Sequence, residues 1–294
     1  MLSRRKLLQH GLAFGGFVAL APLNFAQELS SKPATEKMSL GLVTYNWGAD
    51  WDLPTLLENC RQAKLSSVEL RVDHKHNVSP TLSAEERKII ARMFKESEIE
   101  LVGFGTNYCF HSPDAKVVQN NIDGAKQYVL LSKECGATGV KVKPDALPKE
   151  IDKEKTIAQI AAALNVLGKF AGEHGQEIRL EIHGGCAEIP VIKSIIDQVT
   201  EKSVGLCWNC NKQDLSDPGL KTNFESVRAR FGRTVHIRDL ASTSYPTKEL
   251  FELLRSSGYC GHLLIEEGDQ SLTSEDRMQR LAASAAMFTE WSQS

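Results

Sequence analysis

The stretch RLEIHG, Arg179–Gly184, alternates apolar side chains with chemically reactive ones. Successive side chains of a β-strand point to opposite faces. One face would therefore be apolar and the other polar: Leu180 and Ile182 against Arg179, Glu181 and His183. Strands that are covered on both faces usually read as unbroken apolar runs, and charged groups are costly to bury without partners. The stretch therefore predicts a strand that faces a shared polar cavity.

Three later segments have the same character and also end on residues suited to metal binding or acid–base chemistry. They are VGLCWNCN with Asn209, TVHIRDL with His236, and HLLIEE with Glu266. The first half of the chain repeats the alternation: SVELR sets Glu69 and Arg71 on one face, and GVKVKP sets Lys141 and Lys143 on one face. Two apolar runs, Leu40–Thr44 and Leu101–Phe104, bring the number of predicted strands to eight.

Amphipathic stretches of helical period separate these strands. They are Leu53–Ala63, Ala84–Lys95, Val117–Glu134, Lys155–Glu173, Ile189–Thr200, Leu220–Phe231, Lys248–Ser256 and Glu275–Trp291. Ser83 and Glu86 form a capping-box pattern that predicts the start of the second helix. Eight alternations of strand and helix predict an α/β protein with the (β/α)8 TIM-barrel fold, whose active sites lie at the carboxyl ends of the strands.

Length and composition indicate one globular domain. The chain has 294 residues, of which 41% are hydrophobic, and a barrel of this type takes about 250 residues. We predict a single barrel domain over residues 38–294. The net charge of −2 and the lack of a basic run argue against a nucleic-acid partner.

The N-terminus resembles a twin-arginine export signal. Arg4 and Arg5 precede an apolar run, and Ala26 precedes a polar segment. We predict a signal over residues 1–26, a linker over residues 27–37, export to the periplasm and contact with the export machinery. An uncleaved membrane anchor is the alternative. Seven scattered cysteines do not indicate a disulfide framework.

The motifs LEIHG, WNCN, VHIRD and GYCGHLLIEE, with YNWG after the first strand, resemble the xylose-isomerase-like barrel superfamily, particularly its sugar isomerase and epimerase branch. The resemblance covers the chain from Met38 to the C-terminus. It implies four metal ligands: Glu181, Asn209, His236 and Glu266. Asn209 departs from the family, which usually has Asp there. The resemblance also implies a carbohydrate substrate and makes His183 a substrate-contacting residue.

Moving a sugar carbonyl, or inverting the carbon beside it, requires removal and return of a proton alpha to that carbonyl. We predict that Glu181 and Glu266 are the catalytic proton-transfer pair. Mn2+ or Mg2+ would suit a site made of oxygen ligands and one imidazole. Asn209 in place of Asp removes one negative charge from the site and should lower its affinity for a metal ion. An inward-facing lysine is the alternative source of the positive charge that the reaction needs.

Further side chains at the same end of the barrel are predicted to contact substrate. These are Arg238, Lys143, Glu69, Trp47 and His111, in addition to His183. The alternatives without a catalytic role are a structural network of ion pairs for the charged residues and packing at the rim of the barrel for the aromatic ones. As isolated loop residues, His74, His76 and His111 give little indication of a second metal site.

The predicted function is therefore a carbohydrate isomerase or epimerase. Alternatives are an exported 3-keto-glycoside lyase or hydratase, because the same proton removal starts β-elimination, and a non-catalytic sugar-binding barrel. Apurinic endonucleases of the same superfamily are disfavoured by the charge and the signal. The identity of the sugar and its phosphorylation are left open, and a homo-oligomer is compatible with the sequence.

Overall fold

The computed structural model describes residues 37–293. Within them, eight parallel strands close into a barrel in the order of the sequence. The strands are β1 (Ser39–Val43), β2 (Ser67–Arg71), β3 (Glu100–Cys109), β4 (Gly139–Lys143), β5 (Glu177–Glu181), β6 (Val204–Asn209), β7 (Phe231–Ile237) and β8 (His262–Ile265). Pairing of β1 with β8 completes the closure. The predicted TIM barrel is confirmed.

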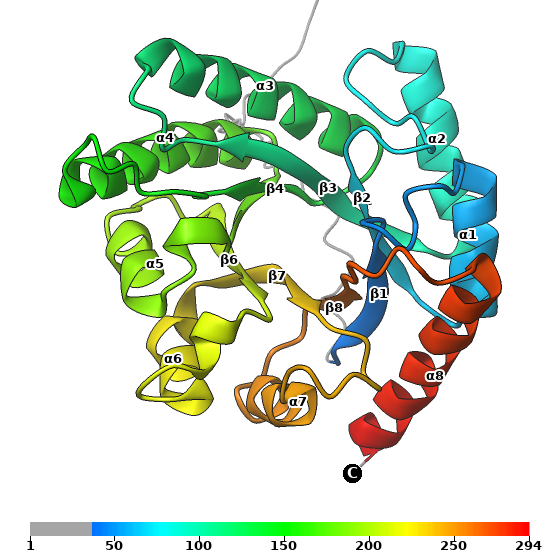
Figure 1. Cartoon of the computed structure of the whole chain (residues 1–294). Helices are drawn as coiled ribbons and strands as arrows, with labels where there is room; N and C mark the ends of the chain where they lie inside the picture. The colour runs from blue at the N-terminus through cyan, green and yellow to red at the C-terminus, as the bar shows by residue number, and fades with distance from the viewer. Residues whose placement is uncertain (1–36, 294) are drawn as a thin grey trace, which may run out of the picture. The chain divides into compact units, whose positions relative to one another are not determined.

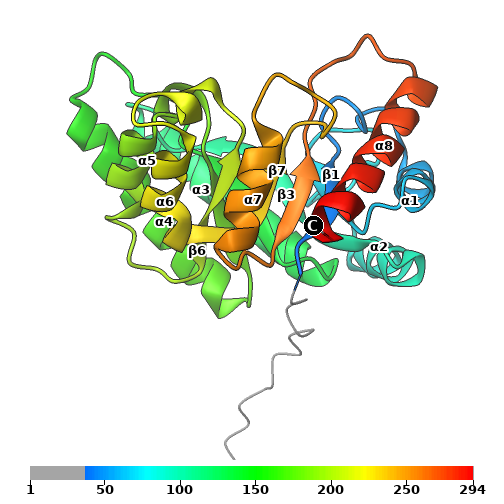
Figure 2. The ribbon, with the colours of Figure 1, turned by 90° about the horizontal axis from the view of Figure 1, so that it is seen from below.

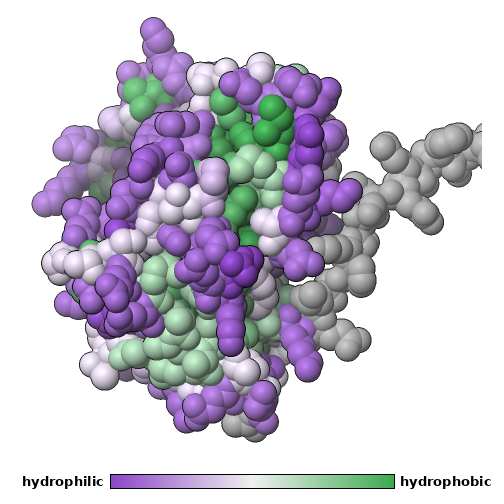
Figure 3. Space-filling model, turned by 90° about the vertical axis from the view of Figure 1, so that its right-hand side faces the viewer, coloured by the Kyte–Doolittle hydropathy of each residue, from purple (hydrophilic) through white to green (hydrophobic). Residues whose placement is uncertain are grey.

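Eight α-helices alternate with the strands and surround them, as Figure 1 and Figure 2 show. They are α1 (Leu53–Gln62), α2 (Ala84–Ser97), α3 (Ala115–Glu134), α4 (Lys153–Glu173), α5 (Ile189–Ile196), α6 (Leu220–Val227), α7 (Thr247–Ser256) and α8 (Ser274–Gln293). Short 3-10 helices lie at Gly184–Cys186, Lys212–Leu215 and Arg228–Arg230. The helices bury apolar faces against the sheet, and the outer surface in Figure 3 is largely hydrophilic with a band of apolar atoms.

Side-chain caps fix the starts of four helices. Asp52, Ser83, Asp114 and Asp152 each accept a hydrogen bond from a backbone N–H in the first turn that follows. Ser83 and Glu86 form the predicted capping box, which satisfies donors that the helix itself leaves unpaired.

Three predicted elements needed correction. The helix predicted over Ile189–Thr200 ends at Ile196, because a turn follows at residues 197–198. Phe231, predicted to end a helix, instead begins β7, because a 3-10 turn follows Val227. β3 runs to Cys109, five residues beyond the predicted strand, although Gly105 and the polar residues after it interrupt the apolar run.

A buried arginine lies inside the barrel, two residues before Glu181 on β5. Arg179 is buried, and its guanidinium donates to the carbonyl of Val102 and to the Thr138 hydroxyl, both at 2.7 Å. A Cβ at Gly103 or Gly139 would collide with this guanidinium or with neighbouring backbone. These two glycines therefore make room for a buried cation beneath the candidate site.

The predicted signal, residues 1–26, lies outside the described residues, and so does all of the predicted linker except Lys37. Among residues 37–293, no helix is both long enough and apolar enough to span a membrane.

Candidate functional site

Four adjacent strands carry polar residues to the same end of the barrel. Glu181 and Asn209 are the last residues of β5 and β6, His236 is the penultimate residue of β7, and Glu266 directly follows β8. The strands are parallel, so their carboxyl ends meet at one edge, where TIM barrels place active sites. The fold thus brings together side chains that lie up to 85 positions apart in the sequence.

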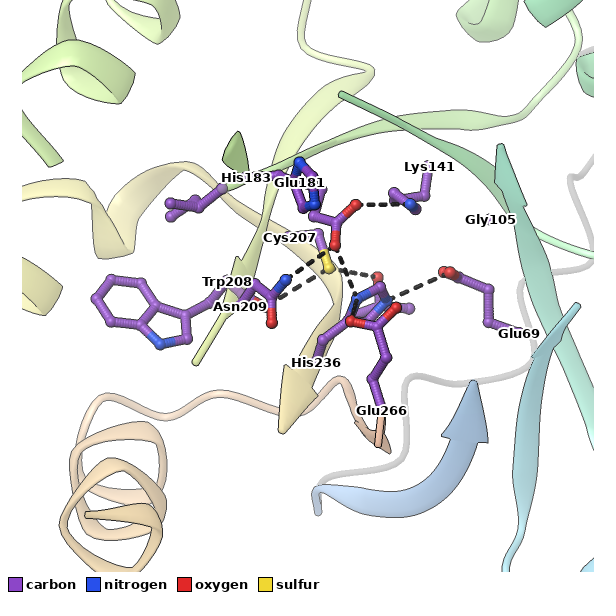
Figure 4. Close-up of polar contacts among 12 residues, drawn as sticks. Glu69, Gly105, Lys141, Glu181, His183, Cys207, Trp208, Asn209, His236 and Glu266 are labelled. Carbon is purple, nitrogen blue, oxygen red and sulfur yellow. Dashed lines mark hydrogen bonds and ion pairs between the residues drawn. The ribbon is translucent and has the colours of Figure 1, made fainter. Parts of the chain in front are cut away.

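The His236 imidazole lies at the centre of this cluster (Figure 4). Its Nε2 is 3.3 Å from Glu69 Oε1 on β2, and its Nδ1 is 3.3 Å from Glu266 Oε2. Nδ1 is also 3.6 Å from Glu181 Oε1. Three carboxylates therefore surround one imidazole. Gly105 on β3 permits this arrangement, because a Cβ there would collide with the Glu69 carboxylate.

Both oxygens of Glu181 have close partners (Figure 4). The Lys141 ammonium on β4 donates to Oε2 at 2.6 Å, and the Asn209 side-chain amide donates to Oε1 at 2.9 Å. Lys141 and Glu181 are both almost completely buried. Charge-assisted hydrogen bonds of this length are among the stronger polar contacts in proteins, so Glu181 is held firmly in one orientation.

Burial and neighbouring charges act in opposite directions on these groups. Burial raises the pKa of Glu181, but the Lys141 ammonium and His236 outweigh it and hold the pKa well below the usual range. Glu266 behaves similarly: burial and the Glu181 carboxylate raise its pKa, but His236 and Lys141 together outweigh them and leave the pKa below its usual value. Burial lowers the pKa of His236, while the Cys207 sulfur and the Glu266 and Glu69 carboxylates raise it well above the usual range. In the metal-free protein these shifts favour ionised carboxylates and a protonated imidazole, and His236 would have to lose its proton to ligate a metal ion.

Several buried atoms in the cluster lack a well-formed partner. Within residues 37–293, both ring nitrogens of His236 and both carboxylate oxygens of Glu69 make no hydrogen bond of good geometry, despite their ion-pair distances. Buried polar atoms are nearly always satisfied, so exceptions call for a bound group or for function.

The donor set fits a divalent ion. One ligand atom each from Glu181, His236 and Glu266 lies within 4.8 Å of the others, and carboxylates with one imidazole suit Mn2+ or Mg2+. In this structure Asn209 directs its amide nitrogen, not its oxygen, at Glu181. To ligate through oxygen, the Asn209 amide would have to turn over and give up that hydrogen bond.

Four of the other predicted substrate contacts lie in or near two groups of side chains at this end of the barrel. Glu69 belongs to the cluster, and Lys143 is half-buried beside it, where burial and the Lys141 ammonium lower its pKa. His183 and His111 lie instead around Asp145 at the ends of β3 to β5: His183 Nδ1 is 2.9 Å from Asp145 Oδ1, and His111 is in ligand range of Asp145.

Arg238 and Trp47 do not join the cluster. Arg238 donates to the backbone carbonyl of Glu266 at 3.2 Å and lines a separate cavity of about 250 Å³. Trp47, which is predicted to contact substrate, is 1% exposed in this structure, and its indole N–H donates to the Asp269 carbonyl at 3.1 Å. The loop after β8 thus contacts the nitrogen edge of this indole, and the Arg280 guanidinium lies over its ring.

Cys207 was absent from the predicted site, and Lys141 was predicted only as an inward-facing lysine that could supply positive charge beside Glu181. Lys141 had a clear signal, because alternation in GVKVKP places it on the inward face, but its contact with Glu181 depends on the barrel register, in which Lys141 pairs with Arg179. Cys207 is buried beside Thr234, whose hydroxyl lies 3.6 Å from the Cys207 sulfur, and it acts electrostatically on His236. Its inward direction followed from strand alternation, although its role in the site did not.

A family model for xylose isomerase-like TIM barrels matches residues 57–291. The chain belongs to this family. The family assignment agrees with the barrel.

Solved structures of sugar epimerases share this fold. An L-ribulose 3-epimerase aligns with a TM-score of 0.74 at 16% identity over 87% of this chain and 95% of its own. A 3-keto-D-glucoside 4-epimerase from E. coli gives 0.70 at 16% identity over 86% and 100%. The IOLI protein, solved with a bound zinc atom, gives 0.73 at 18% over 87% and 99%. At these identities the likeness shows the fold. Among curated proteins, none matches the sequence significantly.

Proposed function

We propose that this barrel is a carbohydrate isomerase or epimerase that transfers a proton at a carbon alpha to a carbonyl. The observation that carries the proposal is the pair of carboxylates at the carboxyl ends of β5 and β8, Glu181 and Glu266, which approach the same nitrogen of His236 at 3.6 and 3.3 Å. The sugar epimerases among the structural neighbours support the substrate class.

Glu266 is the better candidate for the base. The side chain of Glu266 is 12% exposed, whereas that of Glu181 is 2% exposed and tied to Lys141. When Glu266 takes the alpha proton, the C–H electron pair forms the C=C bond of an enediolate and negative charge moves to the carbonyl oxygen. Glu181, which can receive a proton from the Lys141 ammonium that donates to its Oε2 at 2.6 Å, would then return a proton to the same carbon for epimerisation or to the neighbouring carbon for isomerisation. The proton taken up by Glu266 would pass to solvent, from which Lys141 is reprotonated.

The developing negative charge needs a cation close by. Lys141 and Lys143 both lie beside Glu181 and supply fixed positive charge. A divalent ion held by Glu181, His236, Glu266 and the Asn209 amide oxygen would, when bound, add further stabilisation of the oxyanion.

Incorporation of deuterium from solvent tests this function. Wild-type protein would be incubated in D2O with ketohexoses, ketopentoses and 3-keto-glycosides, with and without Mn2+ or Mg2+. We expect deuterium at one substrate carbon together with an epimer or isomer. Tight sugar binding without exchange on any of these compounds would instead support the non-catalytic sugar-binding barrel.

A 3-keto-glycoside lyase or hydratase is the second candidate. A 3-keto-D-glucoside 4-epimerase among the structural neighbours favours a substrate whose ring carries a ketone. In such a substrate, removal of the proton at C2 allows the bond to the glycosidic oxygen to break. Release of the aglycone in the same incubations would identify this reaction, and deuterium exchange without aglycone release would identify the epimerase.

We also propose that the protein is exported by the twin-arginine route. The support is Arg4 and Arg5 directly before an apolar run.

A further inference from the structure

A second group of metal-ligating side chains lies at the carboxyl ends of β3 and β4, outside the cluster around His236. Cys109 is the last residue of β3, His111 follows two positions later, and Asp145 lies two positions after β4. One ligand atom from each residue lies within 4.8 Å of the other two. All three side chains are only partly buried, so an ion could reach them from solvent.

We propose that Cys109, His111 and Asp145 bind a zinc ion, with His183 as the residue that positions the Asp145 carboxylate. Thiolate and imidazole are ligands that select Zn2+ over Mg2+ or Mn2+. The site around His236 offers carboxylates and a single imidazole, so the two sites differ in the metal they prefer. Three protein ligands leave one tetrahedral position for water or a substrate oxygen.

The two histidines are oriented as such a site requires. His111 Nδ1 lies 3.2 Å from the Pro144 carbonyl oxygen, so it serves as donor there and leaves Nε2 with its lone pair for a metal. His183 Nδ1 lies 2.9 Å from Asp145 Oδ1, which leaves the second carboxylate oxygen for the ion. Metal ligands commonly have outer partners of this kind, because those partners fix ligand orientation.

The backbone around the ligands is also held in place. Asn121 on α3 donates to the Cys109 carbonyl at 2.7 Å, and Gln159 on α4 donates to the Phe110 carbonyl at 2.6 Å. These contacts anchor the segment that carries Cys109 and His111 to two helices.

Asp145 is fixed from the side of β5. It adopts a left-handed conformation with φ of 66°, which Asp tolerates better than most residues other than glycine. The Gly185 N–H donates to the Asp145 carbonyl at 2.6 Å. A Cβ at Gly184 would collide with the same carbonyl oxygen. The β5 loop thus has glycines where Asp145 must approach closely.

Cobalt substitution tests the proposal through a signal that only a thiolate ligand produces. Metal-free, reduced protein would be titrated with Co2+, then with Zn2+ in competition. We expect a sulfur-to-cobalt charge-transfer band and the visible bands of a tetrahedral ion, both removed by Zn2+. The Cys109→Ser variant should lose the charge-transfer band, whereas Cys207→Ser and Cys260→Ser should keep it.

The affinity for Zn2+ separates the ligands from the positioning residue. His183→Gln should weaken zinc binding by roughly 10- to 100-fold, as expected for an outer partner, and Asp145→Asn should weaken it further. If Cys109→Ser fails to fold, Asp145→Asn carries the test, because that side chain is 40% exposed. Absence of a charge-transfer band in wild type, persistence of the band in Cys109→Ser, or unchanged zinc affinity in Asp145→Asn would overturn the proposal.

Discussion

The Lys141 ammonium lies 2.6 Å from Glu181 Oε2, and the two side chains are 0% and 2% exposed. The pair joins the neighbouring strands β4 and β5 inside the barrel. It fixes Glu181 and offsets part of the negative charge that Glu69, Glu181 and Glu266 bring together. The pair therefore belongs both to the stability of the barrel and to the chemistry proposed for it.

Replacing Lys141 with Met should destabilise the protein, because it leaves a buried carboxylate without its ammonium. Loss of one partner of a buried ion pair typically costs about 3–5 kcal/mol. Lys141→Met combined with Glu181→Gln should recover much of that loss in the free energy of unfolding, measured by urea denaturation. Equal destabilisation by the single and double variants would show that the pair does not have this role.

The fold was predictable because strand and helix periodicities alternated along the chain. The extension of β3 was not, since Gly105, Thr106 and Asn107 carry no strand pattern. Gly105 pairs with β2 and β4, and Cys109 pairs with β4 beyond an irregularity in the register. The end of α6 was missed for a related reason: Phe231 continues the apolar helical spacing, but it packs as the first residue of β7.

The site was partly predictable, since strand ends reveal which residues meet but not which atoms touch. Alternation placed Glu181 and His236 on the inward face, and the barrel brought them together. The contact of Lys141 with Glu181, and the burial of Trp47 under a loop more than 200 positions away, depend on the register of the closed barrel. The proximity of Cys109 to Asp145 also depends on the register of the barrel. The C-x-H spacing of Cys109 and His111 is visible in the sequence and is compatible with two ligands of one metal ion.

Asp214 should make stability depend on pH. Burial is the largest influence and raises its pKa from 3.8 to about 7, although it accepts hydrogen bonds from the Asn211 N–H and the Tyr245 hydroxyl. The folded state thus binds this proton more tightly than the unfolded state does. Its stabilising contribution is complete below about pH 4 and is lost as pH rises toward 7.

Asp214→Asn should remove that decline, because an amide does not ionise in this range. Relative to wild type, the variant should gain on the order of a few kcal/mol in unfolding free energy between pH 4 and pH 8. Urea denaturation of both proteins across this range measures the difference. Parallel pH profiles would show that Asp214 titrates normally.

Arg4→Lys with Arg5→Lys tests the proposed export route. The double change preserves charge but removes the paired guanidinium groups, which lysine does not replace. We expect the protein to accumulate inside cells that export the wild type, as measured by fractionation and immunoblotting. Unchanged export would indicate a general secretory signal or an anchor.

Asn209→Asp tests metal binding at the site around His236. If Glu181, His236 and Glu266 bind Mn2+ or Mg2+, the added carboxylate should tighten binding in calorimetric titrations and increase stabilisation by metal in thermal melts. Without metal, the same change places another negative charge beside Glu181 and should lower stability. A wild type indifferent to metal, with a variant that is merely destabilised, would favour catalysis assisted by Lys141 and Lys143.

The most direct test of the proposed proton transfer compares wild type with Glu181→Gln and Glu266→Gln in D2O, on a sugar that the wild type converts. Glutamine is nearly isosteric but cannot take up the proton, so each variant should fold normally and incorporate deuterium about 100-fold more slowly or worse. Glu252→Gln is a suitable control outside the cluster, since that side chain is exposed on α7. Wild-type rates of exchange in both glutamine variants would contradict the account.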